Sequence, residues 1–384
     1  GTYGVEEALD TVLAGTAGRV DALTDQNGIP LLASETNFVQ DPVDGDDVVL
    51  SIDIAMQRQL EKILEEGLKR AISESGSAII VDPHTGQVKA MASYPSYDPA
   101  QFAEVENPSL FLNPAVSSTL EPGSIMKVLT VAAGLDSGAI APTQTYYDPA
   151  RYSIDGATVR NVEEDGGPQT RSIVDILKYS LNTGATWTLM QMGGGEINES
   201  GRKTWYEYMT ERYKLGGTTG IEQGFEESGF IPDPNDGFGL NIRYANTAFG
   251  QGMTATPIQM AAAVSSLVNG GRYYQPTVVS GTINEDGEFV ASAPKQLGGQ
   301  VISQQVSNTL VDFMQQTLLH NSLIRQAARE GYIVGGKTGT AEIANPAGGY
   351  YDDRYNGTYV GFVGGNRPEY VIITRVNEPK IAGY

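Results

Sequence analysis

The chain of 384 residues contains no cysteine and only two histidines, His84 and His320. The missing thiols exclude a disulfide framework, thiolate catalysis and cysteine-bound zinc or iron–sulfur sites. Two histidines give poor support to a Ser-His-Asp arrangement or to a histidine-based metal site. Because a chain without cysteine avoids stray oxidation, this composition suits a protein that works outside the cytoplasm.

Basic residues and long apolar runs are also scarce. The 25 Lys and Arg residues stand against 46 Asp and Glu residues, so the net charge is −21. This excess of negative charge argues against nucleic-acid binding and against a basic membrane-surface patch. No run of about 18 apolar residues is present, so the sequence predicts no membrane span. If the native protein is anchored, we expect the anchor to lie outside this sequence.

The first 45 residues differ from the rest. They combine a short helix over 5–13 with a hairpin whose strands, 19–23 and 29–32, flank the turn Asp25-Gln-Asn-Gly28. Such a small piece cannot bury a core alone, so we expect it to pack on the main domain.

The pattern from residue 46 onward predicts an α+β fold. Amphipathic helices are expected over 55–73, with Leu60, Ile63, Leu64 and Leu68 on one face, and over 257–268 and 304–319. Strands are expected over 77–81, 88–93, 333–342, 359–363 and 370–376. Two strands, a long helical insertion and three strands indicate a central antiparallel sheet of about five strands flanked by helices, an α/β sandwich.

A polar stripe on an apolar segment is the most informative local feature. Between Ser124 and Ala133 the only polar residues are Ser124, Lys127 and Thr130, which share one helix face. Burying an isolated ammonium is costly, so Lys127 must be paired or give up its proton easily. A serine beside such an amine is an activated nucleophile. A snorkelling lysine and a solvated serine are the alternative interpretation.

Two further motifs favour the catalytic interpretation. Ser180-Leu-Asn182 offers a second hydroxyl and an amide, and Lys337-Thr-Gly-Thr340 places a cation and hydroxyls at a predicted strand. Each tripeptide alone is weak evidence. The order SxxK, SxN, KTG is the signature of penicillin-recognising serine acyltransferases.

With these motifs the sequence resembles the transpeptidase domain of class B penicillin-binding proteins. Segments 81–86, 248–257 and 336–341 are similar to that family, and the start of the chain is similar to the end of its N-terminal pedestal. The resemblance implies a pedestal remnant over 1–45 and a transpeptidase domain over 46–384. It also implies a final C-terminal helix, which we expect to be missing after Tyr384.

The resemblance implies roles for single residues. Ser124 would attack the carbonyl of a D-Ala-D-Ala bond, and Lys127 would take its proton. Ser180 and Asn182 would relay the proton to the leaving D-alanine and hold the substrate amide. Lys337 would support the charge field that keeps Lys127 neutral.

The substrate side of the site follows from the same resemblance. The Thr338-Gly-Thr340 segment would bind the substrate, with the two threonines holding its carboxylate. The backbone N–H groups of Ser124 and Thr340 would form the oxyanion hole. The implied function is a peptidoglycan DD-transpeptidase that β-lactams acylate, without cofactor or metal. Its implied partners are stem peptides, β-lactam antibiotics and a membrane-embedded glycan polymerase at the extracytoplasmic face of the bacterial membrane.

Two departures from the family pattern and two alternatives stay open at this point. Met126 stands where an aromatic residue is frequent, and Gly361-Phe362 replaces a Trp-Phe pair. A serine β-lactamase or a penicillin-sensing receptor domain on the same fold is the closer alternative, although no Glu-x-x-Leu-Asn segment lies between the second and third motifs. The remote alternative is a nucleotide-binding phosphate loop, because residues 331–338 match GxxxxGK[ST].

Overall fold

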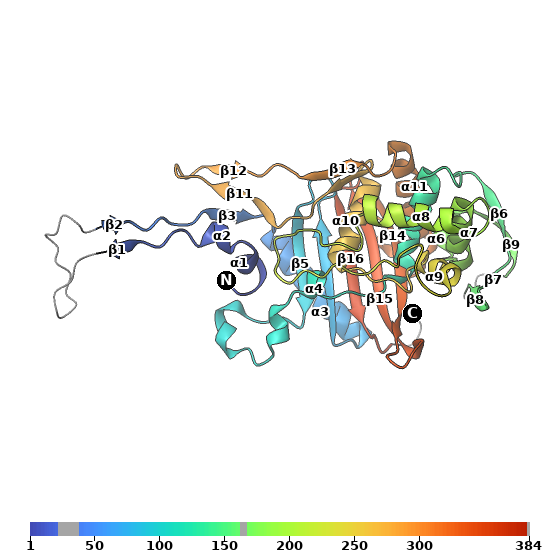
Figure 1. Ribbon diagram of the computed structural model, residues 1–384, viewed down its shortest axis with the longest axis horizontal. Helices are drawn as coiled ribbons and strands as arrows, with labels where there is room; N and C mark the ends of the chain where they lie inside the picture. Colours follow the sequence, from blue (N-terminus) through green and yellow to red (C-terminus); the bar gives the residue numbers. More distant parts are fainter. Residues whose placement is uncertain (22–37, 162–166, 382–384) are drawn as a thin grey trace.

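The structure is a computed structural model that describes residues 1–21, 38–161 and 167–381. Its centre is a five-stranded antiparallel sheet with the strand order β14-β15-β16-β4-β5 (Figure 1). The strands are Ser75–Val81 (β4), Val88–Tyr94 (β5), Ile333–Ala344 (β14), Tyr350–Gly364 (β15) and Tyr370–Asn377 (β16). The α+β class and the five expected strands are therefore confirmed.

The hairpin of β14 and β15 is longer than the sequence predicts. Strand β15 begins at Tyr350 instead of Tyr359, and Ala344 pairs with Tyr350 near the turn. Residues 352–354 are charged and show no apolar alternation, so the pattern gives no strand signal there. Pairing with β14 extends the strand where local propensity does not.

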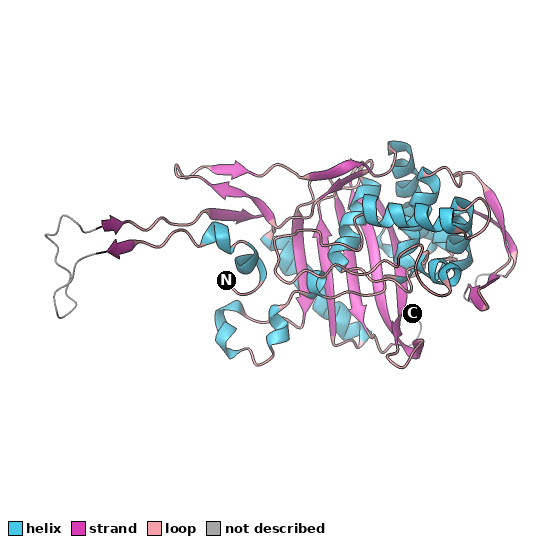
Figure 2. Cartoon of the chain, in the orientation of Figure 1, coloured by secondary structure: helices cyan, strands magenta, loops and turns pink. Residues whose placement is uncertain are grey.

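Helices cover both faces of the sheet (Figure 2). Helix α3, Ile54–Ala71, lies on one face and begins at Asp53, whose Oδ1 accepts the N–H of Met56 at 2.9 Å. Its buried stripe is Leu60, Leu64 and Leu68, packed against alanines of β4 and β5. The predicted contribution of Ile63 is wrong, because this side chain is 51% exposed. The buried face follows a narrow i, i+4, i+8 row.

The opposite face carries the larger core. Helix α10, Pro257–Val268, has the bounds expected from the sequence, and every residue in it is buried. Its N-terminus carries a capping box in which Thr256 and Gln259 satisfy each other's backbone N–H groups. Helix α11, Gln304–His320, packs beside it and against β14. These two helices lie between the sheet and helix α5, Met126–Asp136, which both of them contact.

The remaining helices in the described ranges are short. The α-helices are Gly4–Ala8 (α1), Asp10–Leu13 (α2), Pro114–Ser117 (α4), Met126–Asp136 (α5), Ile173–Lys178 (α6), Asn182–Met192 (α7), Glu199–Glu207 (α8) and Leu240–Thr247 (α9). The 3-10 turns are Pro99–Glu104 (η1), Pro108–Phe111 (η2), Gly123–Ile125 (η3) and Arg325–Ala327 (η6), and a π-helical turn spans Tyr208–Arg212 (η5). No helix among these described residues is long and apolar enough to cross a bilayer.

The other strands of the described residues form small separate sheets. Strand β3 (Asp47–Leu50) pairs with β11 (Val279–Ile283), which also pairs with β12 (Phe289–Ala291). The two-stranded sheets are β1 (Arg19–Asp21) with β2 (Phe38–Gln40), β6 (Thr145–Asp148) with β9 (Gln169–Ser172), β7 (Arg151–Ile154) with β8 (Ala157–Arg160), and β10 (Arg272–Tyr274) with β13 (Gln296–Gln300). The sequence analysis predicted that 19–23 pairs with 29–32, and this pairing is wrong, because β1 pairs with β2 at 38–40. The expected turn and the segment 29–32 lie outside the described residues.

The N-terminal segment packs on the main domain through aromatic rings. The ring of Tyr3 lies 5.0 Å from that of Phe111 and 5.7 Å from that of Phe225, measured between centroids. The backbone N–H of Gly224 donates to the carbonyl of Gly4 at 3.3 Å. These contacts join the first residues to loops that precede α4 and α9.

Candidate active site

The segment that contains Ser124 begins with a tight turn. Ser124 lies in η3, directly before α5, so the helix begins two residues later than the sequence suggests. Gly123 has φ +61°, and a Cβ there would lie 2.6 Å from the carbonyl oxygen of Thr340. Its N–H donates to the carbonyl of Gly250 at 3.1 Å. Only glycine combines this backbone conformation with such a close approach to β14.

Lys127 is fully buried and points at two serines. Its Nζ donates to Ser124 Oγ at 2.8 Å and to Ser180 Oγ at 3.1 Å, and it also donates to the carbonyl of Ser180. Helix spacing brings the amine beside Ser124, because residues three apart are neighbours on one face. The contact with Ser180 comes from the loop before α7.

Ser180 Oγ is the point where the two lysines meet. Lys337 is 3% exposed, and its Nζ donates to Ser180 Oγ at 3.0 Å and to the carbonyl of Thr338 at 2.7 Å. Ser180 itself has φ +56°, a left-handed conformation that is uncommon for a residue other than glycine. Strain of this kind persists where the surrounding structure fixes it. One hydroxyl thus accepts from two buried amines.

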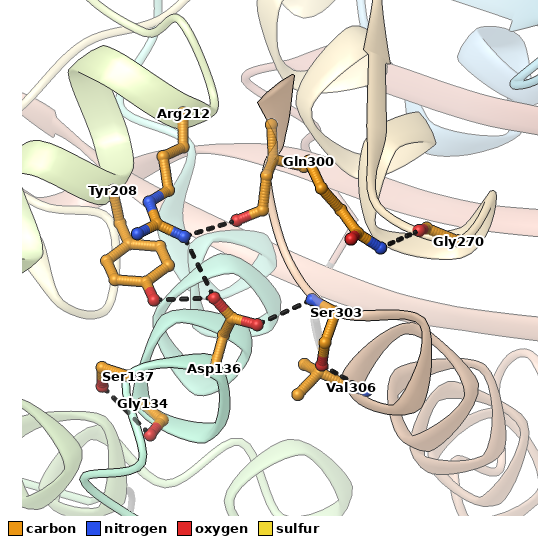
Figure 3. A network of polar contacts seen from close by, with 10 residues as sticks. Gly134, Asp136, Ser137, Tyr208, Arg212, Gly270, Gln300, Ser303 and Val306 are labelled. Atoms are coloured by element: carbon orange, nitrogen blue, oxygen red, sulfur yellow. Dashed lines mark hydrogen bonds and ion pairs between the residues drawn. The ribbon is translucent and has the colours of Figure 1, made fainter. Parts of the chain in front are cut away.

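The far end of α5 is fixed by a second polar network (Figure 3). Asp136 Oδ2 accepts from the Tyr208 hydroxyl at 2.8 Å and from Arg212 Nη1 at 3.1 Å, and its Oδ1 accepts the N–H of Ser303 at 2.7 Å. A carboxylate at a helix C-terminus is unfavourable, because this end of the helix dipole is also negative. The positive charge of the Arg212 guanidinium offsets this repulsion. The network ties α5 to η5 and to the start of α11.

The serines and the KTG strand share one cleft. A cavity of about 760 Å³ is lined by Ser124, Thr158, Val159, Arg160, Asn161, Ser180, Asn182, Asn246, Phe249, Gln251, Thr338, Gly339, Thr340, Glu342 and Tyr350. It contains six of the eight predicted site residues, and the two lysines lie buried behind it. Thr338, Thr340 and Glu342 occupy every second position of β14, so their side chains lie on the same side of the strand.

The β7–β8 hairpin forms a wall of the cleft that the sequence analysis missed. The residues from this wall are Thr158, Val159, Arg160 and Asn161. Asp155-Gly156 between short β-branched stretches is a hairpin signal that would have located it. The amide of Asn182 donates to the carbonyl of Arg160 at 3.1 Å, so the second motif holds this wall in place.

Asn161 fixes the same wall to α7. Its Oδ1 accepts from the N–H of Thr183 at 3.0 Å and from the Thr183 hydroxyl at 2.9 Å, while its Nδ2 donates to Asp148 Oδ2 at 3.1 Å. All three residues are buried. The side chain therefore satisfies polar groups from two other segments, β6 and α7.

The structure rules out a phosphate loop. Lys337 and Thr338 lie within β14, and the chain continues through a hairpin into β15. A phosphate loop requires a turn between a strand and a helix. The nucleotide-binding alternative is therefore wrong.

The two family departures are accommodated by packing. Met126 is fully buried in the main core, and Phe362 is 1% exposed in the same core. Gly361 leaves room for the ring of Tyr359, whose hydroxyl would lie 2.2 Å from a Cβ at that position. A tyrosine thus fills space beside Gly361.

Comparison with known proteins gives the same family as the motifs. Residues 76–384 match the family model described as penicillin binding protein transpeptidase domain. The chain is 33% identical to penicillin-binding protein PbpB of Mycolicibacterium smegmatis, over 100% of this chain and 58% of that protein. It is 30% identical to stage V sporulation protein D of Bacillus subtilis, over 99% of this chain and 57% of that protein. It thus spans little more than half the length of these relatives.

Solved structures agree. The crystal structure of penicillin binding protein 3 from Mycobacterium tuberculosis complexed with aztreonam is similar, with a TM-score of 0.83, 26% identity, and coverage of 99% of this chain and 79% of that chain. A peptidoglycan synthetase from Bifidobacterium adolescentis has the same fold, with a TM-score of 0.82, 23% identity, and coverage of 100% and 66%. From its motifs, its fold and the match over residues 76–384, the chain belongs to the penicillin-binding protein transpeptidase domain family.

Proposed function

We propose that this chain is a peptidoglycan DD-transpeptidase that works through an acyl-serine intermediate. The observation that carries the proposal is the convergence of two buried lysines on Ser180 Oγ, with Lys127 also 2.8 Å from Ser124 Oγ. This convergence supports the proposal, because Lys127 Nζ, the proposed proton acceptor, is within hydrogen-bond reach of both the proposed nucleophile Ser124 and the proposed proton relay Ser180. Relatives named peptidoglycan D,D-transpeptidase FtsI support the substrate class.

In the first half-reaction Ser124 Oγ attacks the carbonyl carbon of the D-Ala-D-Ala bond. The hydroxyl proton passes to Lys127, which is neutral in the resting enzyme because the nearby Lys337 ammonium disfavours a second positive charge in the site. The oxyanion is received by the N–H groups of Ser124 and Thr340, each worth roughly 3–4 kcal/mol in comparable sites. The carbon–nitrogen bond then breaks, and D-alanine leaves with a proton delivered through Ser180.

The second half-reaction reverses the roles. The amine of a neighbouring stem peptide attacks the ester carbonyl, loses a proton to Lys127, and Ser124 leaves with a proton restored to its oxygen. Asn182 holds the substrate amide in both half-reactions. The Thr338 and Thr340 hydroxyls, on either side of Gly339, hold the substrate carboxylate only until it departs with D-alanine in the first half-reaction. The products are the cross-link and the free enzyme.

The setting of this reaction belongs to the same proposal. Stem peptides outside the cytoplasmic membrane are the substrates, and a membrane-embedded glycan polymerase supplies the strands that carry them. β-Lactams acylate Ser124 in place of the stem peptide; similar structures of the Mycobacterium tuberculosis protein with aztreonam and with ampicillin support this. Residues 1–45 form an N-terminal appendage of the domain 46–384, consistent with the ring contacts of Tyr3.

Intact-protein mass spectrometry with benzylpenicillin tests the proposal. We expect a single lasting adduct that is absent from Ser124→Ala. An adduct that disappears while penicillin is consumed catalytically would identify a β-lactamase instead. A folded wild-type protein without any adduct would refute the acyl-serine mechanism, and a thermal melt establishes that it is folded.

A further inference from the structure

A carboxylate outside the three motifs lies against the nucleophile turn. Glu121 Oε1 accepts the backbone N–H of Gly252 at 3.0 Å and the hydroxyl of Tyr350 at 3.1 Å. Its Oε2 is buried and has no hydrogen-bond partner among the described residues. A buried carboxylate oxygen in this state is costly for folding. The arrangement therefore calls for a reason other than stability.

The partners of Glu121 lie at the border of the cleft. Tyr350 lines the cavity that contains Ser124, and so does Gln251, the residue before the other partner, Gly252. Gln251 Nε2 also donates to Glu342 Oε2 at 2.8 Å. Two carboxylates thus hold the 250–252 loop, and Glu121 in addition holds the β14–β15 hairpin through Tyr350.

The 250–252 loop meets the nucleophile turn backbone to backbone. A Cβ at Gly250 would lie 2.2 Å from the carbonyl oxygen of Gly123, so no side chain separates the two segments. Gly123 also approaches β14, since a Cβ at Gly123 would lie 2.6 Å from the carbonyl oxygen of Thr340. Because close-packed backbone transmits displacement, a shift of the loop or the hairpin would move the N–H groups of Ser124 and Thr340.

We propose that ionised Glu121 is a positioning residue for acyl transfer. Its carboxylate holds Tyr350 and the 250–252 loop so that the N–H groups of Ser124 and Thr340 stay aimed at the oxyanion. The inference rests on the proposed acyl-serine function and adds to it a residue outside the SxxK, SxN and KTG motifs. Glu121 touches neither substrate nor reacting atoms and acts through the segments it holds.

The charge of Glu121 makes this role distinguishable from a structural one. Burial raises the pKa of its carboxyl above the usual range, and the Glu342 carboxylate raises it further, while the Gly252 N–H and the Tyr350 hydroxyl oppose the shift. Tyr350 stays a donor, because burial and the Glu121 carboxylate raise its pKa as well. A carboxyl whose pKa is raised on folding costs stability when ionised, and this cost is relieved as the pH falls. Acidification should therefore weaken positioning through Glu121 without weakening the fold through this group.

Second-order acylation rates with a fluorescent penicillin, measured from mildly acidic to mildly alkaline pH, test the proposal. We expect Glu121→Gln to be about tenfold slower at neutral pH, the equivalent of one charge-assisted hydrogen bond. Its thermal midpoint should equal or exceed that of the wild type, and the fall in rate on the acid side should be reduced. Tyr350→Phe, which removes one hydroxyl, should be slowed in the same direction.

A matched control is Glu226→Gln. Glu226 also holds a loop, since its carboxylate accepts the N–H groups of Thr219 and Gly220 at 2.6 and 2.9 Å, but it does not line the cleft. This variant should acylate at the wild-type rate. Wild-type rates in both Glu121→Gln and Tyr350→Phe would overturn the inference and leave the proposed function intact. Slow acylation with a lowered melting midpoint and an unchanged pH profile would also overturn it, as a purely structural effect. A folded wild type that forms no adduct overturns both.

Discussion

Ser180 is a position where backbone strain and chemistry can be separated by two substitutions. Ser180→Ala and Ser180→Gly both delete the hydroxyl that accepts from Lys127 at 3.1 Å and from Lys337 at 3.0 Å. The two variants differ only in the Cβ at a residue with φ +56°. A difference between them in the free energy of unfolding therefore does not involve the hydroxyl and reports the backbone at this position.

The size of that difference follows from two opposing terms. A left-handed conformation costs a residue with a Cβ roughly 1–2 kcal/mol. Glycine loses more backbone freedom on folding, which offsets about 0.5–1 kcal/mol. We expect Ser180→Gly to be more stable than Ser180→Ala by about 0.5–1 kcal/mol, since the first term is the larger. Urea denaturation is the suitable assay, because a chain of this length changes its melting midpoint by only about 1 °C per kcal/mol.

Acylation should behave differently from stability. Both variants leave two buried amines without their shared acceptor, so we expect both to react at least ~100-fold more slowly with penicillin. The control is the pair Lys214→Ala and Lys214→Gly, where φ is +59° and the residue does not line the cleft. That pair should show the same order of stability with wild-type acylation.

Two results would refute this reasoning. If the alanine variant is as stable as the glycine variant at both positions, the left-handed backbone is not strained as argued. If the two Ser180 variants differ strongly in acylation rate, the hydroxyl is not the group that matters. The comparison needs no assumption about the absolute stability of the domain.

Three further predictions concern the framework of the site. Gly123→Ala should fold but lose most acylation, because its Cβ would meet the Thr340 carbonyl oxygen at 2.6 Å; wild-type kinetics with penicillin would contradict the assigned contact. Asn161→Ala should lower the free energy of unfolding by about 2–3 kcal/mol, since buried groups of Asp148 and Thr183 lose their partner; urea denaturation measures this, and a loss below about 0.5 kcal/mol, half of a typical hydrogen bond, would speak against it. Asp136→Ala should cost about 1–2 kcal/mol, because the Tyr208 hydroxyl and the Ser303 N–H lose their acceptor while the partly exposed Arg212 is screened by solvent; adding Arg212→Met should restore little of this loss, and full restoration would show that the unpaired charge is the cause instead.

The parts of the fold and site that are local in sequence were the ones that could be predicted. The bounds of α10 follow from Pro257 and the apolar run behind it, and the Ser124–Lys127 contact follows from helix spacing. The five strands of the main sheet each carry their own β-branched residues, so their existence needed no knowledge of their partners.

The parts that depend on distant segments could not be predicted. Tyr350 and Glu121 are 229 residues apart, and nothing near either residue indicates their hydrogen bond. The start of β15 is set by pairing with β14, and Ile63 is exposed because α3 uses a narrower face than its apolar residues suggest. The β7–β8 hairpin is the exception, since its Asp-Gly turn was a readable local signal.

The place of β16 in the sheet has a consequence for how the chain folds. It is the last strand of the described sequence, yet it lies in the middle of the sheet, between β15 and β4. Val371 pairs with Val81 and Asn377 with Ser75, so this junction closes a loop of nearly the whole domain. The entropy cost of closing so long a loop comes before the stabilising contacts of the junction form, and this slows folding. The central sheet therefore cannot form during synthesis until almost the entire domain has been made, and until then β4 and β5 are without the neighbour that covers their edge.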